Sequence, residues 1–232
     1  MTDFHSHILP EVDDGSQSVD ESILMINALA EQGIDRIVAT PHFYANDESV
    51  SEFLVRRQKA YNELMNAGLP GKPTIIQGAE VRYYDGIRRL SDLKSLCVQG
   101  TKLLLLEMPF TKWTEYTLRE LLDISSNGKV TLVLAHIDRY LKIQKPDVWY
   151  RLADNGILMQ LNSSYINDFF TRHKAIKLLK KGIINFLGSD CHNMNDRAPN
   201  IGKALSIAEK KLGKDFKSGF DDYIDEFFEI KI

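Results

Sequence analysis

The chain has 232 residues, of which 44% are hydrophobic and 26% charged, and its formal net charge is −3. These values are typical of one large single domain, residues 1–232, with a sizeable core. The negative charge argues against nucleic-acid binding, which needs a basic face. No apolar run approaches the ~20 residues that span a bilayer, and no signal peptide is recognisable, so we expect no membrane insertion. Two cysteines make no disulfide framework, which favours a cytoplasmic location.

Apolar segments alternate with helical patterns along the whole chain. The first strand is expected at residues 3–7, and Ser18 then begins a capping box, Ser-Val-Asp-Glu, of a helix that ends at Gly33. Further strands are expected at residues 34–40, 74–76, 102–106, 130–135, 157–161 and 183–187. Further helices are expected at residues 48–66, 86–96, 114–125, 146–153, 172–181 and 201–212.

Seven strands separated by helices predict an α/β protein. Strand segments that are apolar on both faces favour a parallel sheet buried on both sides. Seven βα units in 232 residues favour a closed barrel over an open sheet. A doubly wound sheet stays as the alternative, because periodicity does not show closure. Residues 216–232, rich in Asp, Glu and Phe, are expected to form a helix on the barrel or a contact with another subunit.

Side chains of the types that can bind metals stand at the carboxyl ends of the expected strands. They are His5 and His7, His42, Glu80, Glu107, His136, Asn162, and Asp190 with His192. These ends open on one face of a parallel barrel, where such folds place their chemistry. The loop that holds Asp14 can fold back over the same mouth. Zinc takes about four ligands and magnesium or manganese about six, so this many donors implies two or three ions.

These motifs, in this order, resemble the polymerase-and-histidinol-phosphatase (PHP) superfamily, and within it the bacterial tyrosine-protein phosphatases of capsular polysaccharide loci. The resemblance covers nearly the whole chain and rests on residues 3–7, 12–15, 39–42, 78–80, 106–107, 135–140 and 188–193. It implies a distorted (β/α)7 barrel of the TIM type, which agrees with the strand count reached independently. It also implies hydrolysis of phosphotyrosine on a bacterial tyrosine kinase that governs capsular or exopolysaccharide synthesis.

The resemblance further implies a role for each site residue. One ion is expected on His5, His7, Glu80 and Asp190, a second on Glu80, Glu107 and His136, and a third on Asp14, His42 and His192. Manganese is the expected metal, and iron, cobalt and zinc also suit nitrogen and oxygen donors without a thiolate. Arg139 and Arg197 are expected to hold the phosphate, because a guanidinium fork matches its geometry. Water activated by the ions would attack phosphorus in line.

Several alternatives stay open at this point. Cys191 and Arg197 have the C-x5-R spacing of cysteine-dependent phosphatases, but the residues between them include no glycine and add a carboxylate, so we interpret the spacing as coincidence. Histidinol-phosphate phosphatase shares the ligands and is the second enzymatic candidate. An exonuclease is disfavoured by the acidic chain. A metal-bearing scaffold that binds phosphotyrosine without cleaving it is disfavoured because all nine donors assigned to the three ions are present.

Two features of the sequence differ from the pattern that the resemblance implies. Residues 43–47 lack the basic residue that many relatives carry there, and residues 216–232 do not match the usual ending. The sequence therefore does not predict which side chains contact the substrate beside residues 43–47. It also does not predict the oligomeric state.

Overall fold

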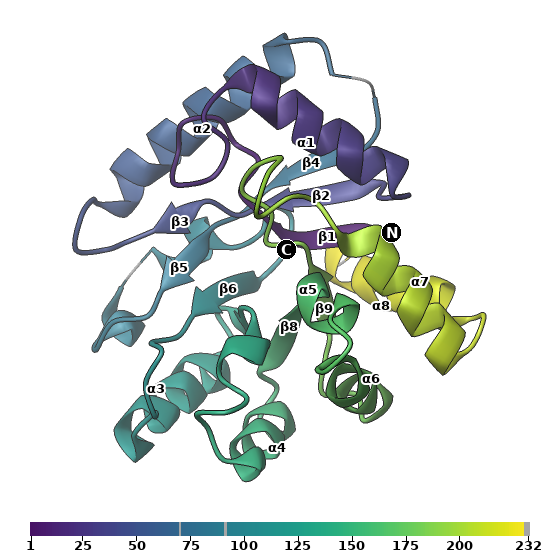
Figure 1. Cartoon of the computed structure of the whole chain (residues 1–232). Coiled ribbons are helices and arrows are strands. Elements are labelled where there is room, and N and C mark those ends of the chain that lie inside the picture. Colours follow the sequence, from purple (N-terminus) through teal and green to yellow (C-terminus); the bar gives the residue numbers. More distant parts are fainter. Residues whose placement is uncertain (70, 91, 230–232) are drawn as a thin grey trace.

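The computed structural model describes residues 1–69, 71–90 and 92–229. Its strands are β1 (Thr2–Ser6), β2 (Arg36–Ala39), β3 (His42–Phe43), β4 (Thr74–Gln77), β5 (Glu80–Arg82), β6 (Leu103–Glu107), β7 (Thr131–Leu134), β8 (Leu158–Asn162) and β9 (Phe186–Gly188). Its α-helices are α1 (Val19–Glu31), α2 (Val50–Asn66), α3 (Glu115–Ser126), α4 (Pro146–Asp154), α5 (Ser163–Asn167), α6 (Arg172–Lys180), α7 (Ile201–Leu212) and α8 (Phe216–Glu229). Figure 1 shows the strands arranged around a centre, with the helices outside them.

Two of the seven predicted strands are each followed, after a break of two residues, by a second short strand. The strand order is β1-β2-β4 in one sheet and β3-β5-β6-β7-β8-β9 in the other, and all the described pairings between these strands are parallel. Residues 40–41 separate β2 from β3, and residues 78–79 separate β4 from β5. Pro41 contributes to the break between β2 and β3, because it has no backbone N–H to donate to a neighbouring strand.

The strand ends predicted at His42 and Glu80 are therefore wrong in detail. Both residues begin a new short strand instead of ending a long one. The register of β3 and β5 places His42 directly opposite Glu80. Because paired residues on neighbouring strands point to the same face, the two side chains lie together.

The first strand also pairs with the chain that follows the last strand. Ser6 and Cys191 form a parallel bridge, and the backbone N–H of His7 donates to the carbonyl oxygen of Cys191 at 2.9 Å. The buried carboxylate of Asp3 accepts hydrogen bonds from the backbone N–H and the hydroxyl of Ser189 at 2.8 and 2.6 Å. These contacts close the sheet into a distorted TIM-like barrel and exclude the doubly wound alternative.

The barrel has one core inside it and a second core between its strands and the outer helices. Along β6, Leu103 and Leu105 pack inside, whereas Leu104 and Leu106 face the helices. Side chains alternate along a strand, so Glu107 follows Leu105 onto the inner side. This alternation explains how an apolar strand ends in an acid that points into the mouth of the barrel.

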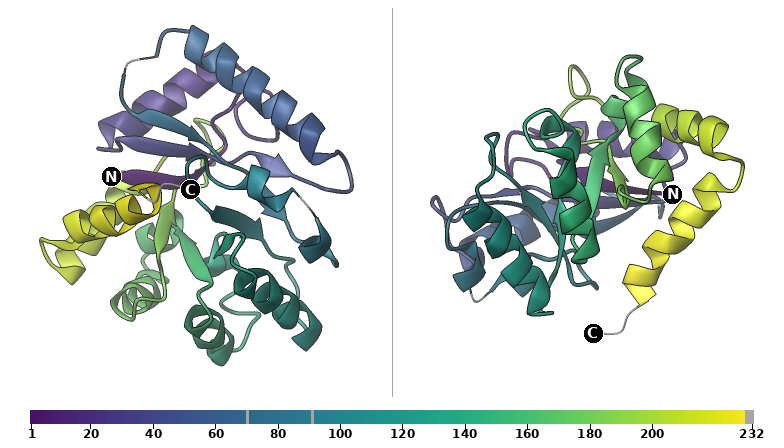
Figure 2. Two further views of the ribbon diagram at one scale, coloured as in Figure 1. Left: turned by 180° about the vertical axis from the view of Figure 1, so that it is seen from behind. Right: turned by 90° about the horizontal axis from the view of Figure 1, so that it is seen from below.

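The predicted C-terminal helix is present as α8 and packs on the barrel. Ile224 is fully buried among the interior residues of the strands. Arg36, at the start of β2, donates to Asp225 at 2.7 Å, and Asn185, just before β9, donates to Tyr223 at 3.0 Å. Helix α8 therefore covers the amino ends of the strands, as the right-hand view of Figure 2 shows. Residues 230–232 of the predicted tail lie outside the described residues.

Two local predictions need correction. The helix expected at residues 86–96 is two short 3-10 turns, Ile87–Arg89 and Leu93–Leu96, because Leu90 has an extended backbone that ends the first turn; residue 91 of that stretch lies outside the described residues. The capping box at Ser18 forms in part: its hydroxyl accepts from Glu21 N–H, but the Glu21 carboxylate accepts from Gln17 N–H. None of the described helices is long and apolar enough to cross a membrane.

Candidate metal centre

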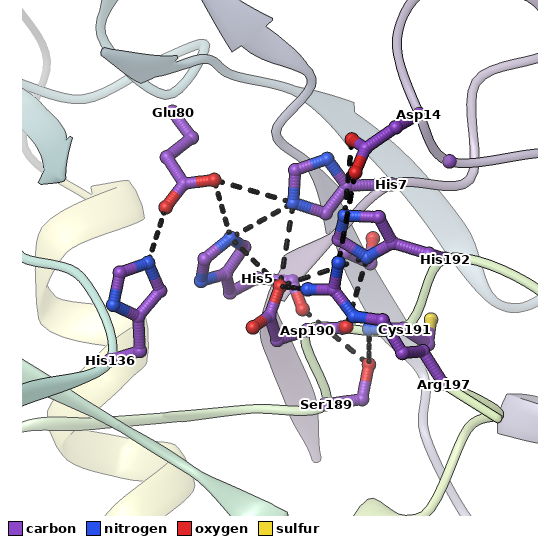
Figure 3. Close-up of polar contacts among 12 residues, drawn as sticks. His5, His7, Asp14, Glu80, His136, Ser189, Asp190, Cys191, His192 and Arg197 are labelled. Carbon is purple, nitrogen blue, oxygen red and sulfur yellow. Dashed lines mark hydrogen bonds and ion pairs between the residues drawn. The ribbon is translucent and has the colours of Figure 1, made fainter. Parts of the chain in front are cut away.

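All nine predicted metal donors converge at the carboxyl end of the barrel. Seven of them are at least 95% buried: His5, His7, Glu80, Glu107, His136, Asp190 and His192. The side chain of His42 is 14% exposed and that of Asp14 is 65% exposed. Figure 3 shows Glu80 between His136 on one side and His5 and His7 on the other. The cluster thus consists of a buried floor and one acidic residue on a loop above it.

The centre of the cluster is formed by the two histidines of the first motif. Their Nε2 atoms lie 3.1 Å apart. Glu80 Oε2 lies 3.2 Å from His5 Nε2 and 3.4 Å from His7 Nε2, and Asp190 Oδ1 lies 3.6 and 3.5 Å from the same two atoms. Burial alone would raise the pKa of Asp190, but the adjacent imidazoles hold it well below its usual range. Two carboxylates and two imidazoles therefore face one small space.

Glu80 also faces a second group of donors. Its Oε1 lies 2.7 Å from His136 Nε2, which is 3.8 Å from Glu107 Oε1. His42 Nδ1 lies 3.1 Å from Glu80 Oε2. Burial and the negative charge of Glu80 raise the pKa of Glu107, whereas His5 and His136 hold the pKa of Glu80 well below its usual range against the effect of burial. Glu80 and Glu107 are neighbouring carboxylates, and such a pair favours a positive charge between its members.

The third group lies under the loop that follows β1. Asp14 Oδ1 is 3.3 Å from His192 Nε2 and 3.5 Å from His42 Nε2. The ring of His7 is 3.8 Å from that of His192, between centroids. Burial, together with the nearby His7 and Arg197, lowers the pKa of His192 to about 3. The imidazole of His192 is therefore neutral at physiological pH, which is the form that binds metals.

Three residues that are not among the nine predicted metal donors fix the donor side chains. Asp13 Oδ2 lies 2.7 Å from His7 Nδ1, and Gln160 Oε1 lies 3.1 Å from His5 Nδ1. Asn162 donates to Asp190 at 2.9 Å. An acceptor on one imidazole nitrogen holds the proton there and leaves the other nitrogen free to face a metal. The sequence signal for Asp13 is its place in the Asp-Asp-Gly turn. The signal for Gln160 is its position two residues before Asn162, on the same face of β8.

Close backbone approach explains two glycines beside the cluster. A Cβ atom on Gly15 would lie 2.3 Å from the carbonyl oxygen of His7, and one on Gly188 would lie 2.5 Å from the Cβ of His5. Only glycine fits at such distances. Two donors themselves have left-handed backbones, with φ of +31° at His136 and +53° at Asp190. Such conformations cost energy and are typical of functional sites.

The two predicted phosphate-binding arginines both contact Asp190. Arg197 Nη2 lies 2.8 Å from Asp190 Oδ1, and Arg139 Nη2 contacts Asp190 Oδ2. Their side chains are about one-third exposed, at 34% and 33%. A third arginine that the sequence analysis missed, Arg82, lies 3.5 Å from Glu107. It comes from the end of β5 and supplies a positive charge on the rim of the mouth, where residues 43–47 carry none.

Two aromatic side chains border the mouth of the cluster. Phe110 is 46% exposed, and its ring lies nearly parallel to that of His136 at 6.3 Å between centroids. The guanidinium of Arg139 lies 5.8 Å from the centre of the Phe110 ring. Tyr44 stacks on His42 at 5.3 Å. The entrance therefore offers flat apolar faces next to the donors.

Cys191 has the wrong surroundings for a nucleophile. Its side chain is fully buried, and burial together with Asp3 raises the pKa of its thiol to about 12. Arg197, which would serve a cysteine-dependent mechanism, contacts Asp190 instead. A neutral, buried thiol is inert, which agrees with the interpretation of the C-x5-R spacing as coincidence.

Comparison with known proteins agrees with this geometry. The family model described as "Capsular polysaccharide synthesis, CpsB/CapC" matches residues 1–220. The chain is 30% identical over 223 residues to the tyrosine-protein phosphatase YwqE of Bacillus subtilis, covering 93% of this chain and 86% of that protein. It is 30% identical over 233 residues to the tyrosine-protein phosphatase CpsB of Streptococcus agalactiae serotype V, covering 93% and 92%.

Solved structures give the same result. A chain from the crystal structures of YwqE from Bacillus subtilis and CpsB from Streptococcus pneumoniae, described as unique metal-dependent tyrosine phosphatases, superposes with a TM-score of 0.84 at 26% identity. The match covers 100% of this chain and 96% of that one. The phosphotriesterase homology protein of Escherichia coli, with a TM-score of 0.59 at 14% identity, shares the fold. The chain therefore belongs to the CpsB/CapC family of capsular polysaccharide synthesis proteins.

Proposed function

We propose that this protein is a metal-dependent protein-tyrosine phosphatase of capsular polysaccharide synthesis. The observation that carries the proposal is the single cluster of nine nitrogen and oxygen donors with Arg139 and Arg197 beside it. Metal-binding side chains next to two guanidinium groups suit the hydrolysis of a phosphate ester. Relatives that carry the name tyrosine-protein phosphatase align over 93% of the chain.

The donor chemistry fits divalent cations. Within the described residues, His42 Nδ1 and His192 Nε2 are buried and make no hydrogen bond, although carboxylate oxygens lie 3.1 and 3.3 Å away. Such atoms need a partner, because a buried polar atom without one is costly. A cation between each of these imidazole nitrogens and its neighbouring carboxylate would provide that partner. Oxygen and imidazole donors without a thiolate suit manganese, and they also accept iron, cobalt or zinc.

We assign the donors to two or three ions. His5, His7, Glu80 and Asp190 would hold the first, Glu80, Glu107 and His136 the second, and Asp14, His42 and His192 the third. Three sets of ligand atoms that lie within 4.8 Å of one another support this number: those of His5, His7 and Asp190, of His42, Glu80 and Glu107, and of His7, Asp14, His42 and His192. His7 and His42 each belong to two of these sets, so each of them could contact a second ion.

The chain's own residues have distinct parts in the reaction. When bound, the ions supply Lewis acidity that neutralises the phosphoryl oxygens and activates water. Arg139 and Arg197 orient the phosphate with the N–H groups that Asp190 leaves free. Phe110 and Tyr44 flank the phenol ring of the substrate. Because phenolate is a good leaving group, a strong general acid is less critical than orientation.

The family supports an inference about the physiological substrate. We infer that it is a phosphotyrosine-bearing segment of a bacterial tyrosine kinase in the cytoplasm. The names of the relatives support the phosphotyrosine, and the description of the family supports the link to capsule synthesis. The two cysteines are free and buried, which suits a reducing compartment.

The test is phosphate release from matched substrates. Protein treated with a chelator is assayed before and after manganese is added, with a phosphotyrosine peptide, the corresponding phosphoserine peptide and histidinol phosphate. We expect release from phosphotyrosine that depends on manganese. Faster hydrolysis of histidinol phosphate would favour the second enzymatic candidate, and no release from any substrate would favour the scaffold.

The alternative based on a thiolate has its own test. Cys191→Ser removes the thiol and changes no proposed metal ligand. We expect the variant to retain its activity with manganese within a few fold. A complete loss of activity in a folded variant with unchanged metal content would support the cysteine mechanism instead.

A further inference from the structure

Helix α6 carries a charge opposite to that of the rest of the chain. Residues 172–181 include one arginine, four lysines and one histidine, and no acidic residue. This segment contributes +5 to a chain whose net charge is −3, so the remaining residues carry −8. Lys174, Lys177, Lys180 and Lys181 are all exposed. The basic segment is therefore a localised feature of an acidic protein.

The cations of this segment are not neutralised within the structure. Among the described residues, none of its lysines or Arg172 lies within 4.0 Å of a carboxylate. Burial and the positive charge of Lys142 lower the pKa of Lys174. Like charges gathered without compensation favour binding of an anionic partner.

A groove runs along this helix. A cavity of about 560 Å³ lies between α6 and α7, and the residues that line it include Phe169, Arg172, Ile176, Lys177, Lys180 and Lys211. Phe169 and Ile176 supply apolar surface, and cations stand on both helices at its sides. We call this feature, defined by those six residues, the α6 groove. Its mixed lining suits a chain with both acidic and apolar side chains.

Two exposed phenylalanines stand at the head of the groove. Phe169 and Phe170 are 78% and 90% exposed, with their rings in edge contact at 5.8 Å. Asp168 holds this turn, because its Oδ1 accepts from Phe170 N–H at 2.7 Å and from Thr171 N–H at 3.0 Å. The aromatic pair is thus presented to solvent by a well-bonded turn. Adjacent exposed aromatic rings are typical of binding surfaces.

The groove begins at the same end of the barrel as the metal centre. Asn162, the last residue of β8, donates to Asp190, and α5 starts directly after it. Helix α6 follows α5 after a short turn, and Figure 1 shows α5 beside β8 and β9 with α6 outside it. A polypeptide held at the metal centre can therefore continue over the rim towards the first turn of α6.

We propose that the α6 groove binds an acidic segment of the polypeptide substrate that flanks the phosphotyrosine. This inference rests on the proposed function, because it adds a second contact for the same substrate. Charge complementarity selects an acidic partner, and the negative remainder of the protein steers it to this face. A concave groove with an apolar floor suits a peptide chain.

The test compares substrates that differ only in flanking charge. Two phosphotyrosine peptides are made, one flanked by glutamates and the other by glutamines, and a small aryl phosphate serves as the third substrate. Lys177→Glu with Lys180→Glu reverses the groove charge. Lys59→Glu is the matched control, since Lys59 is 77% exposed on α2, on the opposite side of the barrel. All assays use full-length protein loaded with manganese.

We expect the double variant to raise the KM for the glutamate peptide about tenfold, with kcat unchanged. The KM values for the glutamine peptide and the aryl phosphate should stay within about twofold. Lys59→Glu should behave like the wild type, and added salt should reduce the preference for the glutamate peptide. If the double variant folds poorly, Lys211→Glu on α7 tests the other side of the groove.

Each other outcome has a separate meaning. Equal KM values for the two peptides in the wild type would overturn the groove proposal while leaving the phosphatase intact. If the double variant lost only its binding to vesicles of anionic lipid, the surface would bind membranes and the proposal would also fail. Hydrolysis of no substrate by the wild type would refute the proposed function, and fluorescence anisotropy of the glutamate peptide would still test the groove.

Discussion

Asp13 shows how much a site depends on a residue that is not among the predicted donors. Its carboxylate faces His7 Nδ1 and accepts hydrogen bonds from the backbone N–H groups of Gly15 and His42 at 2.9 and 2.8 Å. Burial would raise the pKa of Asp13, but His7 and these N–H groups hold it far below its usual value. One ionised side chain thus fixes the residue that follows β1, the first residue of β3 and the loop that carries Asp14.

Removal of this carboxylate should weaken metal binding without removing a ligand. We expect Asp13→Ala to lower the metal affinity about 10–100-fold, because the imidazole of His7 loses its orientation and its proton acceptor. Titration of manganese into metal-free protein measures the effect. Asp20→Ala, an exposed change in the first turn of α1, is the control. An unchanged affinity would show that His7 is oriented by packing alone.

Phe110 allows a test of how the mouth recognises an aromatic leaving group. Its exposed ring lies beside His136 and Arg139, where a phenol ring would stack. We expect Phe110→Ala to raise the KM for an aryl phosphate about 5–10-fold, the effect of losing roughly 1–1.5 kcal/mol of aromatic contact. An alkyl phosphate should show little change. Phe169→Ala, at the α6 groove, should leave both small substrates unaffected, and an equal loss on aryl and alkyl substrates would contradict the stacking role.

At the scale of residues, the sequence predicted the metal donors better than it predicted the neighbouring residues that contact those donors. His5, His7, Glu80 and Asp190 stand next to recognisable apolar strands, so their convergence followed from the fold. Gln160 resembles any polar residue within a strand, and its contact with His5 joins positions 155 residues apart. Arg82 gave no signal either, because its role on the rim depends on the register of β5 with β6, which places it opposite Glu107.

At the scale of elements, the strands were predictable but their interruptions were not. The apolar runs at 34–40 and 74–76 were recognised as strands, yet each continues past its expected end into a second strand. The pairing of β3 with β5 supplies the missing information, because two- and three-residue strands are stable only beside partners. Tertiary contacts thus decide the position of His42 and Glu80 more finely than local pattern does.

Gly188 tests the packing of β9 against β1. A methyl group there would meet His5 Cβ at 2.5 Å and Gln160 Nε2 at 2.8 Å. We expect Gly188→Ala to lower the free energy of unfolding by about 1–3 kcal/mol, because neither buried neighbour can move freely. Gly219→Ala in α8, with nothing within 4 Å of the new Cβ, should instead stabilise by about 0.5–1 kcal/mol. Urea unfolding measures both variants, and equal stabilities would contradict the close approach.

At the scale of the whole molecule, closure of the barrel depends on contacts between the two ends of the chain. Asp3 and Ser6 meet Ser189 and Cys191, and α8 covers the floor beneath them. No local pattern reports such pairing, so periodicity left the open sheet as an alternative. The strand count and the family resemblance pointed to the barrel, and the hydrogen bonds between β1 and the chain after β9 explain how it closes.

The metal centre should stabilise this closed barrel as a whole. Its donors come from β1, β3, β5, β6 and the segments after β7 and β9, so bound cations link almost the full circle of strands. Burial and the negative charge of Glu80 raise the pKa of Glu107, and cations held by these residues would offset that negative charge. A ligand at 100 times its Kd adds about 2.7 kcal/mol if it binds only the folded state. For a chain of this size that corresponds to a rise in Tm of roughly 5–10 °C.

Calorimetry of chelator-treated protein, with manganese added in steps, measures this linkage. We expect Tm to rise with the manganese concentration and to fall again when the metal is removed. Glu80→Gln serves as the comparison, because Glu80 faces both the central and the second group of donors, and it should lose most of the shift. If metal-free and manganese-treated proteins melted at the same temperature, the cluster would not bind manganese in the folded state, and an assay that depends on that metal would need another explanation.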